Sequence, residues 1–155
     1  MTAGVIVAAE VVSASSDMQQ LPMVLNAVIA NTGASPAQVL ADAGFRSEAV
    51  MAELAITQLE TELIIALGRE SKVLAKPRDA HRYPYTVAMA AKFETEQAKI
   101  DYRKRKWIAE PPNGWIKNIL GFRQFSMRGL EKAKAEFKLV CLALNLRRMG
   151  AMQAD

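Results

Sequence analysis

The chain has 155 residues, 51% of them hydrophobic and 23% charged, a balance typical of a folded domain and not of a disordered chain. This length allows one domain with its own core. The single cysteine, Cys141, excludes an internal disulfide and a cysteine-built metal site, and we expect it to be a small buried hydrophobic residue.

Charge is unevenly distributed along the chain. Residues 1–77 carry 4 basic and 8 acidic side chains, a net charge of −4, whereas residues 78–155 carry 16 and 8, a net charge of +8. This polarity predicts an anionic partner for the C-terminal half, most simply a nucleic acid, although an acidic protein surface also fits.

We expect a soluble, cytoplasmic protein. The opening MTAGVIVAAEVV lacks a cationic start and is interrupted by Glu10, which argues against a signal peptide. No stretch approaches the roughly 18 to 20 uninterrupted apolar residues of a membrane span. No membrane partner is therefore predicted.

The first half of the chain alternates strand and helix patterns. Gly4 to Val12 is almost continuously apolar and rich in valine, which predicts a strand covered on both faces. Asp17 is the expected N-cap of the helix that follows. The further elements predicted are a helix at 18–30, strands at 37–41 and 62–67, and a helix at 48–58 that Ser47 caps. This order predicts an α/β fold in which a mixed sheet of about three strands carries flanking helices.

The second half is expected to be helical after a loop. Residues 69–86 are rich in charge and proline and place His81 at the surface. A helical pattern resumes near residue 87, and Pro111-Pro112 predicts a break or restart near Glu110. We expect the last helix, at 129–149, to be buried against the sheet over residues 139–146. The whole chain, 1–155, then comprises a sheet-containing part (1–68), a loop (69–86) and a basic helical part (87–149).

The segment from Asp101 to Met149 carries the most informative side chains. Four consecutive cations, Arg103 to Lys106, precede Glu110, and Lys117 follows seven residues later on roughly the same helical face. An acid among cations fits metal-dependent chemistry on a phosphate backbone, and it also fits a solvated basic helix. Trp107 and Trp115 flank Glu110, where they could stack on an unpaired base or, as is commoner for such residues, be buried.

Two blocks of sequence resemble the C-terminal end of the DDE transposases of bacterial insertion sequences. The first is RKWIAEPPNGWIKNILGFRQFSMRGLEKAKAEFKLVCLALNL, which begins at Arg105. Its matching positions are Arg105-Lys106, Glu110-Pro111, Gly114, Ile116-Lys117, Gly121-Phe122-Arg123, Arg128-Gly129-Leu130-Glu131-Lys132 and Asn145-Leu146. The second, VLADAGFRSEAVMAEL, resembles the strand that carries the family's second catalytic aspartate. The resemblance implies a partial ribonuclease H-like fold.

The resemblance also implies the site residues. Asp42, at the end of a predicted strand, and Glu110 would be the second and third catalytic carboxylates and would hold Mg²⁺ or Mn²⁺, since hard divalent ions take oxygen ligands. The implied DNA-binding residues are Arg105, Lys106, Lys117, Arg123 and Arg128. Without the resemblance, Asp42 would be taken for an ordinary strand-to-helix turn residue.

The sequence departs from the family pattern in two places. The family's first catalytic aspartate lies before the equivalent of Val5, and neither Glu10 nor Asp17 matches it. Pro112-Asn113 replaces the usual hydrophobic pair after Glu110. We therefore expect a C-terminal fragment of a transposase whose parent activity is metal-dependent DNA cleavage and strand transfer, and which is inactive alone.

Two alternatives to this expectation stay open. The chain could be a non-enzymatic DNA-binding protein or a regulator that associates with full-length transposase or with itself. It could also be a remnant without function.

Overall fold

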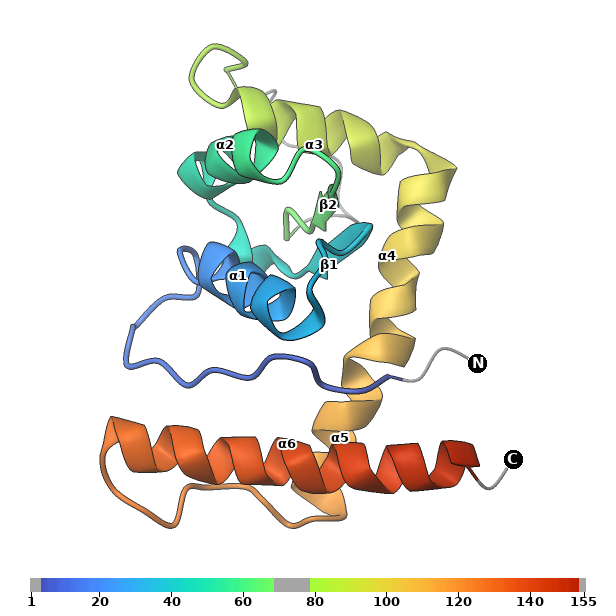
Figure 1. Ribbon diagram of the computed structural model, residues 1–155. Helices are drawn as coiled ribbons and strands as arrows, with labels where there is room; N and C mark the ends of the chain where they lie inside the picture. Colours follow the sequence, from blue (N-terminus) through green and yellow to red (C-terminus); the bar gives the residue numbers. More distant parts are fainter. Residues whose placement is uncertain (1–3, 69–78, 154–155) are drawn as a thin grey trace. The chain divides into compact units, whose positions relative to one another are not determined.

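The computed structural model describes residues 4–68 and 79–153 of the chain. It comprises two compact units, which Figure 1 shows coloured along the sequence. The sheet unit is Ser15–Arg105, and the helical unit is Met1–Ala14 together with Lys106–Asp155.

The sheet unit is built on two parallel strands, β1 (Gln38–Ala41) and β2 (Glu62–Ile65). Gln38 is in register with Glu62, and Ala41 with Ile65. A short 3-10 turn, η1 (Ala43–Phe45), and helix α2 (Glu48–Thr57) connect the strands, as parallel pairing requires a crossover. The other helices are α1 (Leu21–Thr32), α3 (Pro84–Glu94) and α4 (Glu96–Ile108), whose last residues belong to the helical unit.

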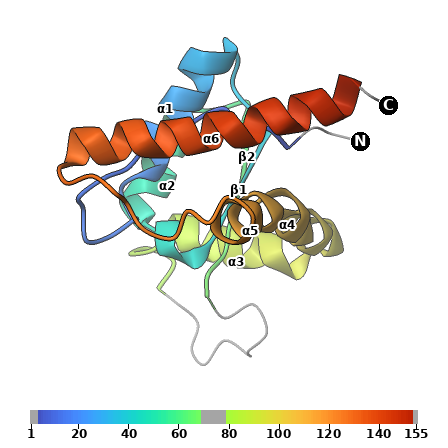
Figure 2. The same ribbon diagram turned by 90° about the horizontal axis from the view of Figure 1, so that it is seen from below.

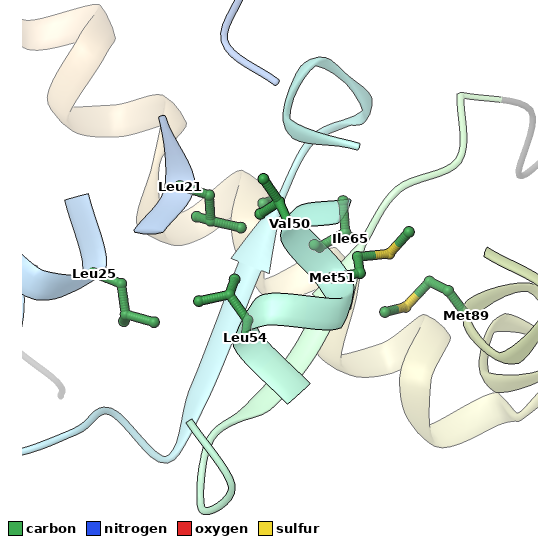
Figure 3. Packing of buried hydrophobic residues seen from close by; sticks show 8 residues of the cluster. Leu21, Leu25, Val50, Met51, Leu54, Ile65 and Met89 are labelled. Carbon is green, nitrogen blue, oxygen red and sulfur yellow. The ribbon is translucent and has the colours of Figure 1, made fainter. Parts of the chain in front are cut away.

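Apolar side chains from α1, α2, α3 and the strand pair form one core cluster. Figure 3 shows Leu54 of α2 and Ile65 of β2 among the clustered side chains. The buried members are Leu21, Leu25, Ala41, Val50, Met51, Leu54, Ile65 and Met89. Burial of this apolar surface is the main force that holds the short strands and their helices together.

A carboxylate at the start of α2 attaches the start of α3. Glu48 accepts hydrogen bonds from the backbone N–H groups of Tyr85 (2.6 Å) and Thr86 (3.0 Å), and from Thr86 Oγ1 (2.6 Å). The first N–H groups of a helix have no partner within the helix, so Glu48 provides an acceptor for two of them. This contact fixes α3 against α2.

The helical unit consists of α5 (Glu110–Asn118), α6 (Leu130–Gln153) and the N-terminal segment. Figure 1 and Figure 2 both show α6 running across α5. Ala133, Cys141 and Leu144 are buried on one face of α6, and Ile116 is buried on α5. Burial raises the pKa of the Cys141 thiol, as expected for an inert core cysteine.

Residues 4–14 run along α6 as irregular chain. The amide of Asn145 accepts a hydrogen bond from the Ile6 N–H (2.8 Å) and donates one to the Ile6 carbonyl (2.7 Å). Further along, Lys138 Nζ lies 3.0 Å from Glu10 Oε1. The predicted strand from Gly4 to Val12 is therefore wrong, because a side chain takes the place of a neighbouring strand for the Ile6 backbone.

The fold class is confirmed in its main feature, a mixed α/β chain with a helical C-terminal half. In the described residues the sheet has two parallel strands, not three mixed ones. The strands at 38–41 and 62–65, the Ser47 cap of α2 and the helix restart at Glu110 agree with the predictions. His81 is exposed and Cys141 is buried, as expected.

Three helix boundaries differ from the predictions. Gln20, not Asp17, is the N-cap of α1, because the Asp17 carbonyl accepts from the Gln20 N–H in a separate turn. The helix expected from residue 87 begins at Pro84 and is interrupted at Thr95. Thr95 Oγ1 donates to the Lys92 carbonyl and accepts from the Ala98 N–H, which ends α3 and starts α4. Most of the predicted loop, residues 69–78, lies outside the described residues.

The expected burial of residues 139–146 is also wrong. Leu144 is 1% exposed, but Leu146 is 61% exposed, and Leu139 and Leu142 are exposed as well. A helix that packs through one face buries only the residues that recur every three or four positions, and on α6 these include Cys141 and Leu144.

Candidate functional site

Asp42 lies where β1 ends and acts as the N-cap of η1. Its Oδ1 accepts a hydrogen bond of 2.9 Å from the Gly44 N–H. A Cβ at Gly44 would come 3.1 Å from Asp42 Oδ1, so a side chain there would crowd the carboxylate slightly. The side chain of Asp42 remains 51% exposed. The structure thus supports both interpretations of this residue: a turn-forming cap and an accessible carboxylate at a strand end.

Arg105 is the residue of α4 that approaches Asp42. Its Nη1 lies 4.0 Å from Asp42 Oδ2, and its guanidinium carbon lies 5.6 Å from the centre of the Tyr102 ring. The Arg105 side chain is 32% exposed. A predicted phosphate-binding cation and a predicted metal ligand therefore form an ion pair within the sheet unit.

The other cations of the run on α4 are exposed. Arg103 and Lys106 are exposed, and Lys104 is exposed but also bonds the carboxylate of Asp101. Three exposed cations close together on one helix create a local positive potential suited to an anionic ligand. The sequence predicted such a positively charged surface for Arg103 to Lys106.

Asp101 is a buried carboxylate that the sequence analysis did not single out. The hydrogen bond from Lys104 lowers the pKa of the Asp101 carboxyl, and that from Gln97 (3.0 Å) acts in the same direction. Its partners occupy positions i+3 and i−4 of α4, so helical spacing was the sequence signal that could have revealed it. Two side chains of its own helix thus favour the charged form of Asp101.

Glu110 and Lys117 lie at opposite ends of α5. Glu110 is the first residue of the helix and Lys117 is in its last turn, and both are exposed. These positions suit the helix dipole, which favours an acid at the N-terminus and a base at the C-terminus. Pro112 is accommodated at the start of the helix, where it is buried. Glu110 belongs to the helical unit and Asp42 to the sheet unit.

Arg123 and Arg128 occupy the connection between α5 and α6. Arg123 donates from Nε to the Lys117 carbonyl (3.3 Å) and from Nη2 to Asn118 Oδ1 (3.2 Å). It therefore stabilises the C-terminus of α5, where carbonyl groups lack helical partners. Arg128 is exposed shortly before α6 begins.

The same connection is attached to α6 by Glu136. Its carboxylate accepts from Ser126 Oγ (2.6 Å), from the Ser126 N–H (2.9 Å) and from the Met127 N–H (3.3 Å). These bonds, led by the one from the Ser126 side chain, lower the pKa of the Glu136 carboxyl. Glu136 thereby holds the segment that carries Arg128.

The two predicted metal ligands, Asp42 and Glu110, belong to different units of the chain. Asp42 and Glu110 each offer the oxygen ligands that Mg²⁺ and Mn²⁺ prefer, but no three His, Cys, Asp or Glu side chains gather among the residues that the structure covers. A hollow of about 580 Å³ lies between α1 and α2, and none of the predicted site residues lines it.

Residues 2–146 match the family model of the transposase DDE domain. The match covers nearly the whole chain, and the chain belongs to this family. It is thus a transposase-type protein, and the resemblance seen in the two sequence blocks is confirmed. The family generally uses divalent metal ions and acts on DNA.

Searches of curated proteins and of solved structures gave no significant match. In the described part of the chain, none of the helices combines the length and apolarity needed to cross a bilayer.

Proposed function

We propose that this chain serves in the transposition of an insertion sequence, as part of a ribonuclease H-like catalytic domain whose activity is metal-dependent DNA cleavage and strand transfer. The family match over residues 2–146 carries this proposal. The parallel strand pair supports it, because side chains at the carboxyl ends of parallel strands are well placed to form sites, and Asp42 occupies such an end. The proposed location is the cytoplasm, which gives access to a bacterial chromosome.

The proposed DNA contacts are electrostatic. The cations proposed to contact DNA are Arg105, Lys106, Lys117, Arg123 and Arg128, of which Lys106, Lys117 and Arg128 are exposed. Contacts of this kind to phosphates hold DNA without reading its sequence. Arg105 and Arg123 would bind phosphate in addition to their contacts with Asp42 and the end of α5.

A salt titration tests the DNA-binding part of the proposal. Fluorescence anisotropy with a labelled duplex of mixed sequence should show binding that weakens steeply between about 50 and 200 mM salt. Lys106→Gln should weaken binding and reduce the slope of log K against log salt by about 1. Arg82→Gln, which removes an exposed cation outside the predicted site, is the control. Absence of binding at low salt would contradict the proposal.

For the catalytic part, we propose that Asp42 and Glu110 are metal ligands and that the chain alone does not cut DNA. The sequence pattern matches two of the three carboxylates that the family uses. Calorimetry with Mn²⁺ should detect only weak binding that Asp42→Asn abolishes, with Glu53→Gln as the control. Nicking of supercoiled plasmid in Mg²⁺ or Mn²⁺ should be absent. Nicking that Asp42→Ala removes would overturn the proposed inactivity.

A second candidate function is DNA binding or regulation without catalysis, alone or in association with full-length transposase. The ion pair between Asp42 and Arg105 favours it, because a carboxylate that faces a guanidinium is already partly neutralised. Under this function, Asp42→Asn would leave Mn²⁺ binding unchanged while DNA binding persisted. Under the first, the same substitution would remove Mn²⁺ binding.

A further inference from the structure

Helix α6 carries a row of exposed apolar side chains on the face opposite its buried residues. The members of this apolar row are between 51% and 64% exposed and are Leu139, Leu142, Leu146 and Met149. They recur at alternating intervals of three and four residues, the period with which one helix packs along another. Cys141 and Leu144, on the other face, are buried. The helix thus has two apolar faces, and within the described residues only one of them is covered.

Small residues accompany the apolar row. Ala135, Ala143 and Gly150 are exposed and lie four positions before or after a member of the row, which makes them neighbours on the helix surface. A Cβ at Gly150 would meet nothing within 4 Å. Short side chains beside long ones allow a second helix to come close and its side chains to interdigitate. The shape of this face therefore suits another helix.

A second hollow opens beside the N-terminal half of the apolar row. Its volume is about 320 Å³, and it is lined by Leu120, Phe122, Met127, Glu136, Leu139, Val140 and Ala143. The one charged group of this lining, the Glu136 carboxylate, already accepts hydrogen bonds from Ser126 and Met127. Leu139 belongs both to the row and to the hollow, so the two form one continuous apolar surface.

The C-terminal half of α6 carries side chains that fit such a hollow. Met149 is 51% and Met152 is 44% exposed, and methionine is flexible enough to fill irregular apolar spaces. Within one chain Met149 lies about 15 Å along the helix from Leu139, too far to enter the hollow. In an antiparallel pair of α6 helices, a two-fold axis between Leu142 and Leu146 places the methionines of each copy at the hollow of the other.

Charge also favours the antiparallel direction. Lys132 lies seven residues before Leu139 and is exposed, so a parallel pair would place the two copies of this lysine side by side. An antiparallel pair separates them and sets the helix dipoles in opposite directions.

The apolar row is a poor surface for nucleic acid, because the cations beside it are engaged. Lys138 Nζ lies 3.0 Å from Glu10 Oε1, and the guanidinium carbon of Arg147 lies 3.8 Å from the centre of the half-buried Trp115 ring. Trp115 thus has the packed role of the two that the sequence left open. Trp107, which is 83% exposed, does not, but it follows a cationic run. An uncharged row of long apolar side chains favours a protein partner.

We propose that two copies of this chain associate through α6 as an antiparallel, two-fold symmetric pair, and that Met149 and Met152 of each copy fill the hollow of the other. In a two-fold pair one surface serves both partners, and this surface contains both the hollow and the side chains that fill it. The row is only about 15 Å long, so we expect a dissociation constant in the micromolar range. This inference goes beyond the proposed function and depends on neither DNA nor a metal.

Sedimentation velocity of the full chain at about 1 to 200 µM tests the association. The mean mass should rise from that of a monomer to that of a dimer. Leu146→Glu should weaken association at least about tenfold, because each dimer would bury two unpaired carboxylates. Ile56→Glu, at a 71% exposed position of α2 in the sheet unit, is the matched control and should leave association unchanged. Because Leu146 is exposed in the single chain, the urea midpoint of dilute Leu146→Glu should match that of the unsubstituted chain.

Disulfide formation tests the antiparallel register. Leu139→Cys and Met149→Cys chains are mixed and oxidised, and mass spectrometry identifies the products because the two chains differ in mass. The proposed axis sets position 139 of one copy opposite position 149 of the other, so the mixed disulfide should predominate. The unsubstituted chain, whose Cys141 is buried, is the control and should form no disulfide.

Three outcomes would overturn the inference. The first is a chain that stays monomeric up to about 200 µM. The second is a dimer that Leu146→Glu leaves intact, since it would use another surface. The third is a predominance of disulfides between identical chains, which parallel pairing would give. None of these measurements involves DNA, so a failure of this inference and a failure of the proposed function are distinguishable.

Discussion

The guanidinium of Arg105 and the carboxylate of Asp42 face each other across the sheet unit, with Nη1 4.0 Å from Oδ2. The two side chains come from α4 and from the end of β1, more than sixty residues apart in sequence. Both are partly exposed, and ion pairs of this kind contribute between about 0 and 1 kcal/mol. The ion pair is therefore weak. A phosphate could replace Asp42 as the partner of Arg105, and a cation could replace Arg105 as the partner of Asp42.

This pair predicts an unusual effect of an acid-to-amide change. Asp42→Asn, measured in EDTA, should strengthen duplex binding by about two- to fivefold, because Arg105 loses its competing carboxylate. The same change in an Arg105→Gln background should have no such effect. Fluorescence anisotropy of the four proteins completes a double-mutant cycle. Equal strengthening in both backgrounds would show that Asp42 acts through general charge and not through Arg105.

Glu48 should be essential for attaching α3 to α2. Glu48→Ala leaves the N–H groups of Tyr85 and Thr86 without their acceptor, and Thr86 is buried. We expect a loss of about 1–3 kcal/mol in the free energy of unfolding, the range for stranding buried donors. Urea denaturation measures it, with Glu53→Ala on the exposed face of the same helix as control. A loss no larger than that of the control would contradict this role.

Truncation of two leucines of α6 should have very different effects on stability. Leu144→Ala opens a cavity at a buried position and should destabilise the protein by about 2–5 kcal/mol. Leu146→Ala, two residues later and exposed, should change stability by no more than about 0.5 kcal/mol. Urea denaturation of the two variants compares them directly. Equal losses would mean that the outer face of α6 is also covered.

The connection between α5 and α6 should loosen in acid. The pKa of Glu136 is lowered from its ordinary value of 4.5 by hydrogen bonds from Ser126 and Met127. A lowered pKa stabilises the folded connection above pH 4.5, and that stabilisation disappears as pH falls through the folded value. Amide resonances of Ser126 and Met127 should shift in this acidic range. In Glu136→Gln, which does not titrate, the transition should be absent.

Much of the local structure could be read from the sequence. The end of β1 before Asp42, the Ser47 cap of α2 and the restart of the helix at Glu110 all depend on short-range rules of hydrogen bonding and proline geometry. The family match likewise follows from residues in order along the chain. These features can be predicted without knowing the tertiary contacts of the chain.

The remaining features depended on tertiary contacts. Apolarity predicted a strand from Gly4 to Val12, but a strand needs a neighbouring backbone, and the Ile6 backbone bonds to the Asn145 side chain instead. Apolarity also predicted burial around Leu146, but a helix buries only the face that finds a partner. The pairing of Arg105 with Asp42 and the exposure of Trp107 also depend on tertiary contacts. Composition and spacing determined which side chains are available, and only packing decided which of them are covered and which are left to bind.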